Sequence, residues 1–565
     1  MPEQVTLGKY IFERLNQLKV NTIFGLPGDF NLALLDHIDE VDGVRWAGNA
    51  NELNASYAAD GYARVKGLAC MITTFGVGEL SAANGIAGSF AEHVPVVHIV
   101  GVPTMQATKD KLLLHHTLGD GRFDVYRKMF AQICQEAIFI DDIATAPFEF
   151  DRMFKTAVVT KRPVYIALPS NFVEMTVPAA LLEYKIDMVL PPNDPEVEDE
   201  CISVIEKMTV EAENPVILVD ACALRHEVQD LVAKLADETQ FPIFATPMGK
   251  SAISEDHPRF GGIYTGVLSK PDVKEAVESA DLVLSIGGLL SDFNTGSFSY
   301  EYSTRNVIEF HSDYTKVKSA KYPNVKMQYA LERLVETLPQ FLGDYTPVPL
   351  PTSQLAYKDI TVDEEAPLTQ EFLWKRVSHF FKPTDIIISE TGTSAFGIVQ
   401  SHFPGKVIGI SQVLYGSIGF ATGCAAGCSF AAEELDPARR VILFTGEGSM
   451  QLTVQSISDC CRWNLNPYLF VLNNGGYTIE KLIHGPKKDY NNIQPWDYSK
   501  ILGCFAANHD YQNCKVSSEG QLDSLLSSQK FNTPDKIRMI EIMLPSFDAP
   551  QNLVEQAKIS EKTNV

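Results

Sequence analysis

Short apolar runs alternate with longer mixed segments along most of the chain, which is the pattern of buried parallel strands separated by helices. The predicted strands cover residues 21–24, 71–74, 96–100, 215–219, 282–286, 441–445 and 468–472, and residues 52–65 are predicted to form a helix. We therefore predict an α/β fold, in which doubly wound parallel sheets carry helices on both faces.

Two polar, proline-bearing connectors divide this pattern into three blocks. The connectors are residues 184–199 and 344–368, which leave the blocks 1–183, 200–343 and 369–565. Each block is long enough to form one doubly wound sheet. No internal sequence repeat is visible, so the sequence leaves open whether the first and third blocks share a fold.

The most informative motif lies in the third block, at the ends of two predicted strands joined by a helix. Gly446-Glu447-Gly448 follows the strand 441–445, and Asn473-Asn474-Gly475-Gly476 ends the strand 468–472. Open α/β sheets bind ligands at the carboxyl ends of their strands. The Glu447 carboxylate, the Asn474 amide oxygen and a carbonyl near Gly476 suit Mg²⁺, and the glycines let backbone N–H groups approach a phosphate. The motif predicts a site for magnesium and a diphosphate.

This motif resembles the signature of the thiamine-diphosphate enzymes, in which Gly-Asp-Gly is followed by Asn-Asn after a spacer of this length. Residues 25–31, 48–54, 114–117 and 476–481 resemble the catalytic segments of the 2-oxo-acid decarboxylases in that family, above all those of the fungal pyruvate decarboxylases. The resemblance covers essentially the whole chain. One position departs from it, because the metal-binding Asp of the family is Glu447 here, whose side chain is one methylene longer.

The resemblance implies a role for each block. Block 1–183 would bind the pyrimidine of thiamine diphosphate, block 200–343 would be structural or regulatory, and block 369–565 would bind the diphosphate and Mg²⁺. The expected reaction is the non-oxidative decarboxylation of a 2-oxo acid, with pyruvate giving acetaldehyde and CO₂ through a thiamine ylid and an enamine, as in alcoholic fermentation.

Two other functions stay open at this point. One is a decarboxylase of aromatic or branched-chain 2-oxo acids such as phenylpyruvate, which a panel of substrates would separate. The other is a weakly catalytic, thiamine-binding regulatory paralogue. Glu447 and Gly475 favour the paralogue, because relatives carry Asp at the first position and often a polar residue at the second, whereas the retained catalytic residues argue against it.

The resemblance assigns proton transfer to a small set of acids and imidazoles. Glu52 would help to form the ylid through the aminopyrimidine ring, and Asp29, His115, His116 and Glu480 would exchange protons with the substrate. Taken alone, Glu52 is an acid favoured at a helix N-terminus, and the two histidines would be incidental.

Further residues would surround the cofactor and the substrate. With Glu52, the cofactor-binding positions implied by the resemblance are Thr391, Gly392, Ser417, Ile418, Gly446, Gly448, Ser449, Asn474, Tyr477, Thr478 and Ile479. Ile418 corresponds to the bulky residue that holds the cofactor bent, although its apolar type alone predicts a core position. Thr391, Ala395 and Ile479 correspond to walls of the substrate pocket.

Cys222 matches a position proposed in this family for allosteric activation by substrate, with Glu92 and His93 on the suggested route. A buried cysteine after a strand explains the same residues equally well. In the same block, Ile286-Gly287-Gly288 follows a strand but starts no GxGxxG motif, so we predict neither flavin nor NAD there.

Composition and charge narrow the partners and the compartment. The net charge of −24, without a basic stripe, argues against nucleic acid. The N-terminus lacks an apolar signal segment, and no run of about 18 apolar residues suggests a membrane span. Ten cysteines without a CxxC pair predict buried thiols in a reducing compartment, so we expect a cytoplasmic protein. The resemblance places the cofactor between two chains, which implies a homodimer as the minimal active unit and a homotetramer as the assembly.

Overall fold

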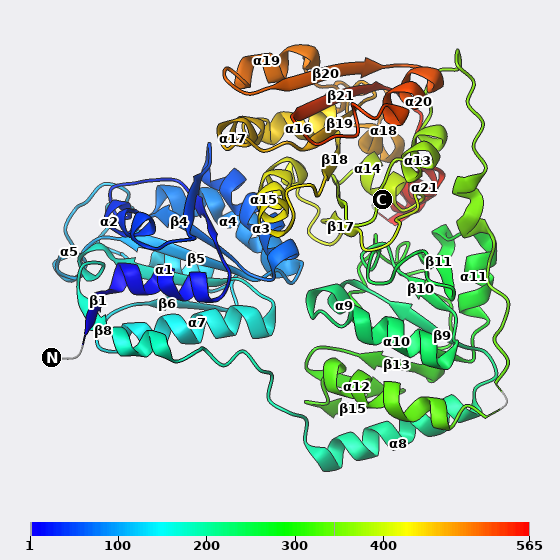
Figure 1. The fold of residues 1–565 in the computed structure, drawn as a ribbon, viewed down its shortest axis with the longest axis horizontal. Helices are drawn as coiled ribbons and strands as arrows, with labels where there is room; N and C mark the ends of the chain where they lie inside the picture. Colours follow the sequence, from blue (N-terminus) through cyan, green and yellow to red (C-terminus); the bar gives the residue numbers. More distant parts are fainter. Residues whose placement is uncertain (1–2, 344, 564–565) are drawn as a thin grey trace.

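The chain forms three α/β domains, each built around its own sheet (Figure 1). The computed structural model describes residues 3–343 and 345–563. Residues 1–2, 344 and 564–565, which include the start of the second predicted connector, lie outside the described residues. In Figure 1 the N-terminal domain is blue to cyan, the middle domain green, and the C-terminal domain yellow to red. The predicted α/β fold is confirmed.

The N-terminal domain carries a six-stranded parallel sheet in the order β3-β2-β4-β5-β7-β6. The strands are β2 (Thr22–Gly25), β3 (Arg45–Gly48), β4 (Ala69–Thr74), β5 (Val96–Val102), β6 (Glu136–Phe139) and β7 (Val164–Pro169), and β1 (Gln4–Thr6) pairs separately with β8 (Thr176–Pro178). The helices are α1 (Leu7–Gln17), α2 (Leu32–Asp36), α3 (Glu52–Lys66), α4 (Val77–Ala91), α5 (Met105–Lys109), α6 (Val125–Phe130) and α7 (Ala146–Thr160). Every residue of β2, β4, β5 and β7 is buried, which explains their continuous apolar sequences.

The C-terminal domain repeats this topology with an unrelated sequence. Its parallel sheet has the order β17-β16-β18-β19-β21-β20, so the first to sixth strands occupy the same places as in the N-terminal domain. The strands are β16 (Ile386–Ser389), β17 (Ile408–Ser411), β18 (Val441–Gly446), β19 (Tyr468–Asn473), β20 (Tyr511–Val516) and β21 (Ile537–Met543). The shared fold that the sequence left open is therefore present.

Nine α-helices accompany the C-terminal sheet in the described part of the chain. They are α13 (Gln370–Ser378), α14 (Thr393–Ile398), α15 (Phe420–Leu435), α16 (Glu447–Thr453), α17 (Ser456–Arg462), α18 (Thr478–Ile483), α19 (Ile501–Phe505), α20 (Glu519–Ser527) and α21 (Gln551–Thr563). The single helix predicted between the two motif strands is two short helices, α16 and α17, because the chain turns at residues 454–455.

The middle domain has a mixed sheet of seven strands in the order β11-β10-β9-β12-β13-β14-β15. The strands are β9 (Pro215–Val219), β10 (Ile243–Ala245), β11 (Phe260–Ile263), β12 (Leu282–Ile286), β13 (Val307–Phe310), β14 (Tyr314–Val317) and β15 (Ala320–Pro323), and the helices are α8 (Pro195–Glu211), α9 (Ala221–Arg225), α10 (Gln229–Thr239), α11 (Pro271–Glu278) and α12 (Met327–Thr337). The first five strands in this order are parallel, as expected, but β14 and β15 extend the edge antiparallel. Short turns connect β13, β14 and β15, and such turns can join only antiparallel neighbours.

The first predicted connector, 184–199, is shorter in the structure. Helix α8 begins at Pro195, and the Asp194 side chain accepts hydrogen bonds from the N–H groups of Glu196 and Val197. A proline in the first turn after an acidic N-cap favours a helix, so the same residues that suggested a connector start the middle domain. The second connector, 344–368, contains a 3₁₀ helix, η7 (Ser353–Lys358).

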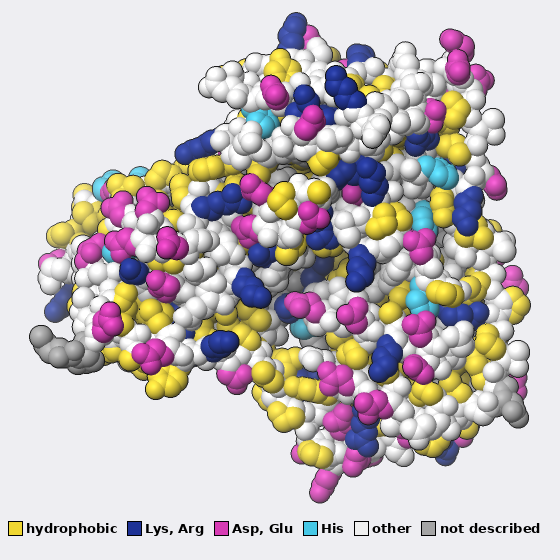
Figure 2. Space-filling view, in the orientation of Figure 1, with side chains coloured by type: hydrophobic (Ala, Val, Ile, Leu, Met, Phe, Trp, Pro, Cys, Tyr) yellow, Lys and Arg dark blue, Asp and Glu magenta, His cyan; other side chains and the backbone are white. Residues whose placement is uncertain are grey.

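Helices α3 and α15 join the N- and C-terminal domains into one continuous hydrophobic core. Glycines permit their close approach: a Cβ on Gly427 would lie 1.8 Å from the carbonyl oxygen of Ala58, and one on Gly61 would lie 2.4 Å from that of Cys424. The middle domain keeps separate cores on the two faces of its sheet. Figure 2 shows it as a lobe separated by a notch from the N-terminal domain, with acidic and basic side chains interspersed over this face.

Candidate active site

The first predicted catalytic group is a cluster of Asp29, His115 and His116. His115 Nε2 lies 2.6 Å from Asp29 Oδ2, and His116 Nε2 lies 3.9 Å from Asp29 Oδ1. The Phe30 ring stacks on His115 at 5.1 Å between centroids, and the Tyr126 hydroxyl donates to the carbonyl of His116. The structure therefore brings together residues separated by more than 80 positions, and the histidines lie on a loop as expected.

These three side chains are open to solvent in the single chain. Asp29 and His115 are about half exposed, and His116 is partly covered. One ligand atom from each lies within 4.8 Å of the others, which is also a spacing that a metal ion could use. An imidazole pair sharing one carboxylate is equally suited to general acid–base catalysis.

Glu52 occupies the first turn of α3, in the same domain. Asn51 caps the helix by accepting the N–H of Asn54. Burial raises the pKa of the Glu52 carboxyl above its ordinary value. A Cβ on Gly78 would lie 3.1 Å from Glu52 Oε1, so the glycine keeps space open beside this carboxyl.

The second group is the pair of loops after β18 and β19. The two strands pair in parallel up to Gly446 and Leu472, which brings Glu447 beside the Asn474–Gly476 loop. Glu447 is 3% exposed, and its Oε1 accepts the N–H of Gly476 at 2.7 Å. Burial raises the pKa of Glu447, although the loop N–H groups oppose the shift.

The residues predicted around the diphosphate gather at these loops. Gly446 ends β18, and Gly448, Ser449, Asn474, Tyr477 and Thr478 lie in the loop after β19 or at the starts of the helices that follow. A Cβ on Gly448 would lie 2.8 Å from the Tyr477 ring, and Gly476 has a φ of +118°. At both positions a residue other than glycine would therefore be strained or would overlap a neighbouring group.

Lys481, which the sequence did not indicate as a site residue, holds the loop after β19 in place. Its buried Nζ donates to the carbonyl of Gly475 at 2.6 Å and lies 3.4 Å from the Ser546 hydroxyl. Lys481 reaches the loop only because helix α18 begins at Thr478, directly after the loop. The linear sequence therefore does not indicate this contact.

The predicted substrate pocket forms a small apolar cavity of about 60 Å³. Thr391, Gly392, Ala395 and Ile479 all line it, as do Leu268 and Phe293 of the middle domain. The middle-domain wall was not predicted, because no local pattern shows which surfaces of separate domains meet. Glu480 follows Ile479 on α18, is exposed, and makes no contact with the Asp29 cluster within the described residues.

The loop before α15 carries Ser417 and Ile418. The Ser417 N–H donates to Gln412 Oε1 at 2.7 Å, and its hydroxyl lies 2.6 Å from the Tyr57 hydroxyl and 3.0 Å from Asn84 Nδ2. Ser417 is thus held by α3 and α4 of the N-terminal domain. Ile418 is half-buried rather than part of the core, so its side chain is available to a ligand.

Glu390, also missed, is a fully buried acid directly behind this region. Its Oε1 accepts the N–H of Thr391 at 3.1 Å, and its Oε2 accepts that of Ala421 at 3.3 Å. Burial raises the pKa of Glu390 to about 8, against the lowering effect of these N–H groups. The side chain links the pocket residue Thr391 to the start of α15. An acid at a strand end is too common in sequences to indicate this role.

Cys222, Glu92 and His93 meet where the three domains join. Glu92 Oε1 accepts the N–H groups of Leu414 at 2.8 Å and Tyr415 at 3.2 Å, while the Glu92 carbonyl accepts Arg225 Nε at 3.0 Å. Glu92 therefore connects the N-terminal domain to both of the others.

Burial disfavours the charged forms of Cys222 and His93 at this junction. The Cys222 thiol is 6% exposed, and burial raises its pKa to about 12, so little reactive thiolate is present at neutral pH. Burial and the charge of Arg162 lower the pKa of His93 to about 3. This environment explains a structural cysteine well, and an activating role for Cys222 stays a prediction.

The two halves of the candidate site are not joined within one chain. Among the described residues, no hydrogen bond or ion pair connects Asp29, His115, His116 or Glu52 to Glu447, Asn474 or Glu480. In residues 3–343 and 345–563, no helix has the length and apolar character needed to cross a bilayer.

Comparisons with known proteins cover all three domains. Three descriptions of thiamine pyrophosphate enzymes match the chain: the N-terminal TPP binding domain over residues 5–127, the central domain over 202–338, and the C-terminal TPP binding domain over 390–535. The chain is 61% identical to a pyruvate decarboxylase of Candida albicans and 60% identical to pyruvate decarboxylase isozyme 1 of Saccharomyces cerevisiae, in each case over 99% of both chains. A putative thiamin diphosphate-dependent enzyme from Mycobacterium smegmatis shares the fold, with a TM-score of 0.74 and 18% identity over 96% of this chain and 100% of that one.

The raised pKa of Glu390 predicts a pH dependence of stability. Between its ordinary value of 4.5 and about 8, the folded chain holds a proton that the unfolded chain has released, so the free energy of unfolding falls as pH rises through this window. Glu390→Gln keeps the shape without titrating and should flatten the decline by at most about 1.4 kcal/mol per pH unit. Unfolding of parent and variant at pH 6 and pH 8 measures this difference, and identical slopes would contradict it.

Proposed function

The chain belongs to the thiamine pyrophosphate enzymes, and we propose that within this family it is a pyruvate decarboxylase, a carboxy-lyase that converts pyruvate to acetaldehyde and CO₂. The observation that carries the proposal is full-length similarity: pyruvate decarboxylases of several yeasts match 99% of the chain at 56–61% identity. The site supports it with an acid–imidazole cluster, a loop rich in oxygen donors and a small acyl-sized cavity.

The C-terminal half suits a metal-bound diphosphate. The buried Glu447 carboxylate, the Asn474 amide and the Gly476 carbonyl are hard oxygen donors, and we propose that they hold Mg²⁺. Burial removes water from the Glu447 carboxylate and raises its pKa. A nearby cation would stabilise the charged form of such a carboxylate, so the raised pKa fits a metal ligand. Thiamine diphosphate, when bound, supplies a carbon nucleophile and an electron sink for the departing carboxylate.

The N-terminal half supplies the proton chemistry. Glu52, with its raised pKa and open surroundings, is positioned to hold a proton against the pyrimidine side of the cofactor. Asp29, His115 and His116 form a second relay that can protonate the product carbon and accept the hydroxyl proton as the aldehyde leaves. Glu480 of the other half completes this set only if the halves meet.

The size of the cavity favours a small substrate. Its volume is about 60 Å³, and mostly apolar side chains line it. A small apolar space suits the methyl end of pyruvate, which favours pyruvate over the aromatic acids.

We infer that a homodimer is the minimal active unit, because apolar side chains are exposed beside both halves of the site. Leu32 is 49% and Val77 53% exposed near Asp29 and Glu52, and Leu452 is 51% exposed near Glu447. A second copy that brought the N-terminal half of one chain onto the C-terminal half of the other would cover these side chains. We further propose that two dimers form a tetramer and that the protein acts in the cytosol, in keeping with its unpaired cysteines.

Glu52→Gln should leave thiamine diphosphate binding intact and reduce turnover of pyruvate by about 10²–10⁴-fold, because an amide fills the same space but cannot exchange a proton. Calorimetric titration of the cofactor and release of CO₂ from pyruvate measure the two properties. Near-parental turnover at saturating cofactor would remove Glu52 from the mechanism.

A mixing experiment provides the control for both the role of Glu52 and the shared site. Glu52→Gln and Glu447→Ala chains should each be inactive alone, but refolded or co-expressed mixtures should regain roughly a quarter of parental activity, since half the dimers are mixed and each has one intact site. Mixtures that stay inactive would place both halves of a site in one chain.

Glu447 gives a separate test of the metal site. Glu447→Asp should retain or strengthen Mg²⁺-dependent binding of thiamine diphosphate, because Mg²⁺ tolerates little error at oxygen distances of about 2.0–2.1 Å. Glu447→Ala should abolish that binding, as should removal of Mg²⁺ by a chelator. Titration of Mg²⁺ at fixed thiamine diphosphate measures the effect. If the Ala variant bound metal and cofactor like the parent, Glu447 would not be a ligand.

Ile479 tests the substrate range. Ile479→Ala should raise the turnover of phenylpyruvate relative to pyruvate, because it enlarges a cavity in which one or two methylenes discriminate by about 1–3 kcal/mol. Ala395→Gly removes a single carbon from another residue that lines the cavity and serves as a milder comparison. An unchanged ratio of kcat/KM values in the Ile479 variant would place the limiting wall elsewhere.

A further inference from the structure

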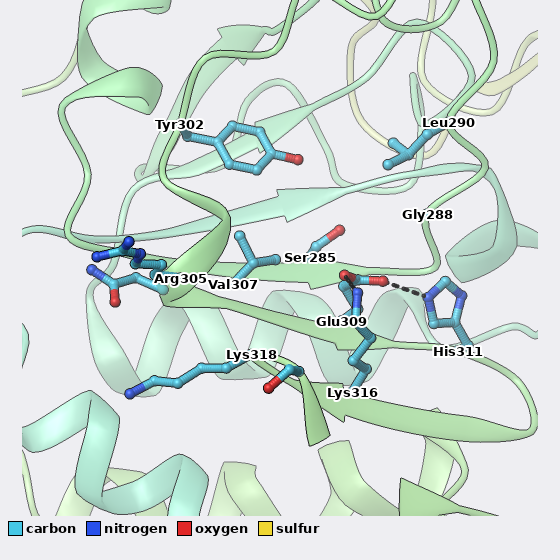
Figure 3. Close-up of a pocket in the computed structure, with 12 residues that line it drawn as sticks. Ser285, Gly288, Leu290, Tyr302, Arg305, Val307, Glu309, His311, Lys316 and Lys318 are labelled. Carbon is cyan, nitrogen blue, oxygen red and sulfur yellow. Dashed lines mark hydrogen bonds and ion pairs between the residues drawn. The ribbon is translucent and has the colours of Figure 1, made fainter. Parts of the chain in front are cut away.

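A second, larger cavity lies in the middle domain, over one face of its sheet (Figure 3). Its volume is about 780 Å³, within the range of small-molecule sites, and all of its lining residues fall between Ser285 and Ser319. None of the residues assigned to the candidate active site lines it. Neither the proposed reaction nor the junction around Glu92 uses this cavity.

The cavity exists because the crossover from β12 to β13 carries no covering helix. Residues 287–306 are irregular except for a 3₁₀ turn, η5 (Thr304–Asn306), whereas a connection between neighbouring parallel strands usually contains an α-helix. The segment is anchored, because the buried Asp220 accepts the N–H of Leu289 at 2.7 Å and the amide of Asn294 at 3.0 Å. Long irregular segments in compact domains are commonly functional.

Strand register sets the floor of the cavity. Ser285 of β12 pairs with Glu309 of β13, which pairs with Lys316 of β14, so the three side chains form a row on one face. Lys318 continues the same face next to Val307, to whose carbonyl its N–H donates. The fold therefore brings β12, β13 and the β14 edge together to build one polar surface.

Positive charge exceeds negative charge around this surface. Lys316 Nζ lies 2.6 Å from Glu309 Oε1, and His311 Nε2 lies 3.4 Å from Glu309 Oε2. Arg305 and Lys318 have no ion pair or side-chain hydrogen bond in the described part of the chain. With three cations against one carboxylate, the cavity has a local surplus of two positive charges in a protein whose net charge is −24.

Two hydroxyls at this surface have no hydrogen-bond partner. Ser285 is 6% and Tyr302 9% exposed as whole residues, and neither hydroxyl has a partner among the described residues. Both residues line the cavity, and neither hydroxyl oxygen is itself buried. Figure 3 shows the two hydroxyls directed into the space between Tyr302, Ser285 and Leu290. They are therefore free to bond to a polar ligand.

We propose that this cavity binds a phosphorylated small molecule. Arg305 and Lys318, the two cations without an ion pair, would hold the phosphate dianion, and the Ser285 and Tyr302 hydroxyls would bond to the polar body that carries it. Figure 3 shows the Arg305 and Lys318 side chains on the same side of the cavity, while Lys316 lies beside Glu309. A dianion matches the surplus of two charges, and a planar guanidinium with an ammonium group is a donor set suited to phosphate.

Calorimetric titration of the full chain, loaded with thiamine diphosphate and Mg²⁺ so that the diphosphate site is filled, tests the proposal. The probes are inorganic phosphate, a hexose monophosphate and AMP, with acetate as the anion control at constant ionic strength. At least one phosphate probe should bind at least tenfold more tightly than acetate. The order of the three distinguishes free phosphate, a sugar phosphate and a nucleotide as the source of the phosphate group.

Variants locate the binding. Arg305→Ala/Lys318→Ala should weaken the best phosphate probe at least tenfold, whereas Lys207→Ala/Lys234→Ala, with the same charge change on exposed positions of α8 and α10, should not. Ser285→Ala/Tyr302→Phe should weaken a phosphate ester more than inorganic phosphate. Equal loss in both charge variants, or no preference of the parent for phosphate over acetate, would overturn the proposal. Neither result depends on decarboxylase activity, which is measured separately.

Discussion

The packing of α3 against α15 is the constraint on which the rest of the structure depends. Glycines 61 and 427 bring the two backbones so close that any side chain there would overlap a carbonyl oxygen. This contact merges the cores of two domains, and it fixes the two helix starts that carry Glu52 and the Ser417–Ile418 loop. The Tyr57–Ser417 hydrogen bond at 2.6 Å then links α3 directly to that loop. The contact thus fixes the placement of Glu52 and of the Ser417–Ile418 loop relative to each other within one chain.

Burial also sets the chemistry of the acids near the joint. Glu52, Glu390 and Glu447 all have raised pKa values, and desolvation is the largest cause for each. Each is nevertheless anchored differently: Glu390 by N–H groups of two segments, Glu447 by one loop, and Glu52 by its place in a helix start. The same physical cause, burial, therefore acts on three carboxyls that different local structures hold.

The middle domain contributes more than a spacer between the other two. Leu268 and Phe293 line the small apolar cavity beside Ile479, and Arg225 donates to the Glu92 carbonyl at the junction of the three domains. Phe293 belongs to the same irregular segment whose residues Leu290, Tyr302 and Arg305 border the basic cavity. Within the described residues, the crossover from β12 to β13 contains no α-helix, and this one irregular segment contacts two separate cavities.

The sequence by itself determined the strands, the domain order and the chemistry-bearing loops. A strand that is buried on both faces of a sheet has a continuous apolar sequence, and Gly446–Gly448 and Asn473–Gly476 lie at the ends of two such strands. It could not show that β14 and β15 run antiparallel or that Pro195 starts a helix rather than extending a connector. Nor could it show that Glu390, Lys481 and Phe293 lie against residues of the candidate site. Those features depend on contacts between residues far apart in the chain. Local periodicity records which face of an element is buried, but only tertiary packing decides what lies against it.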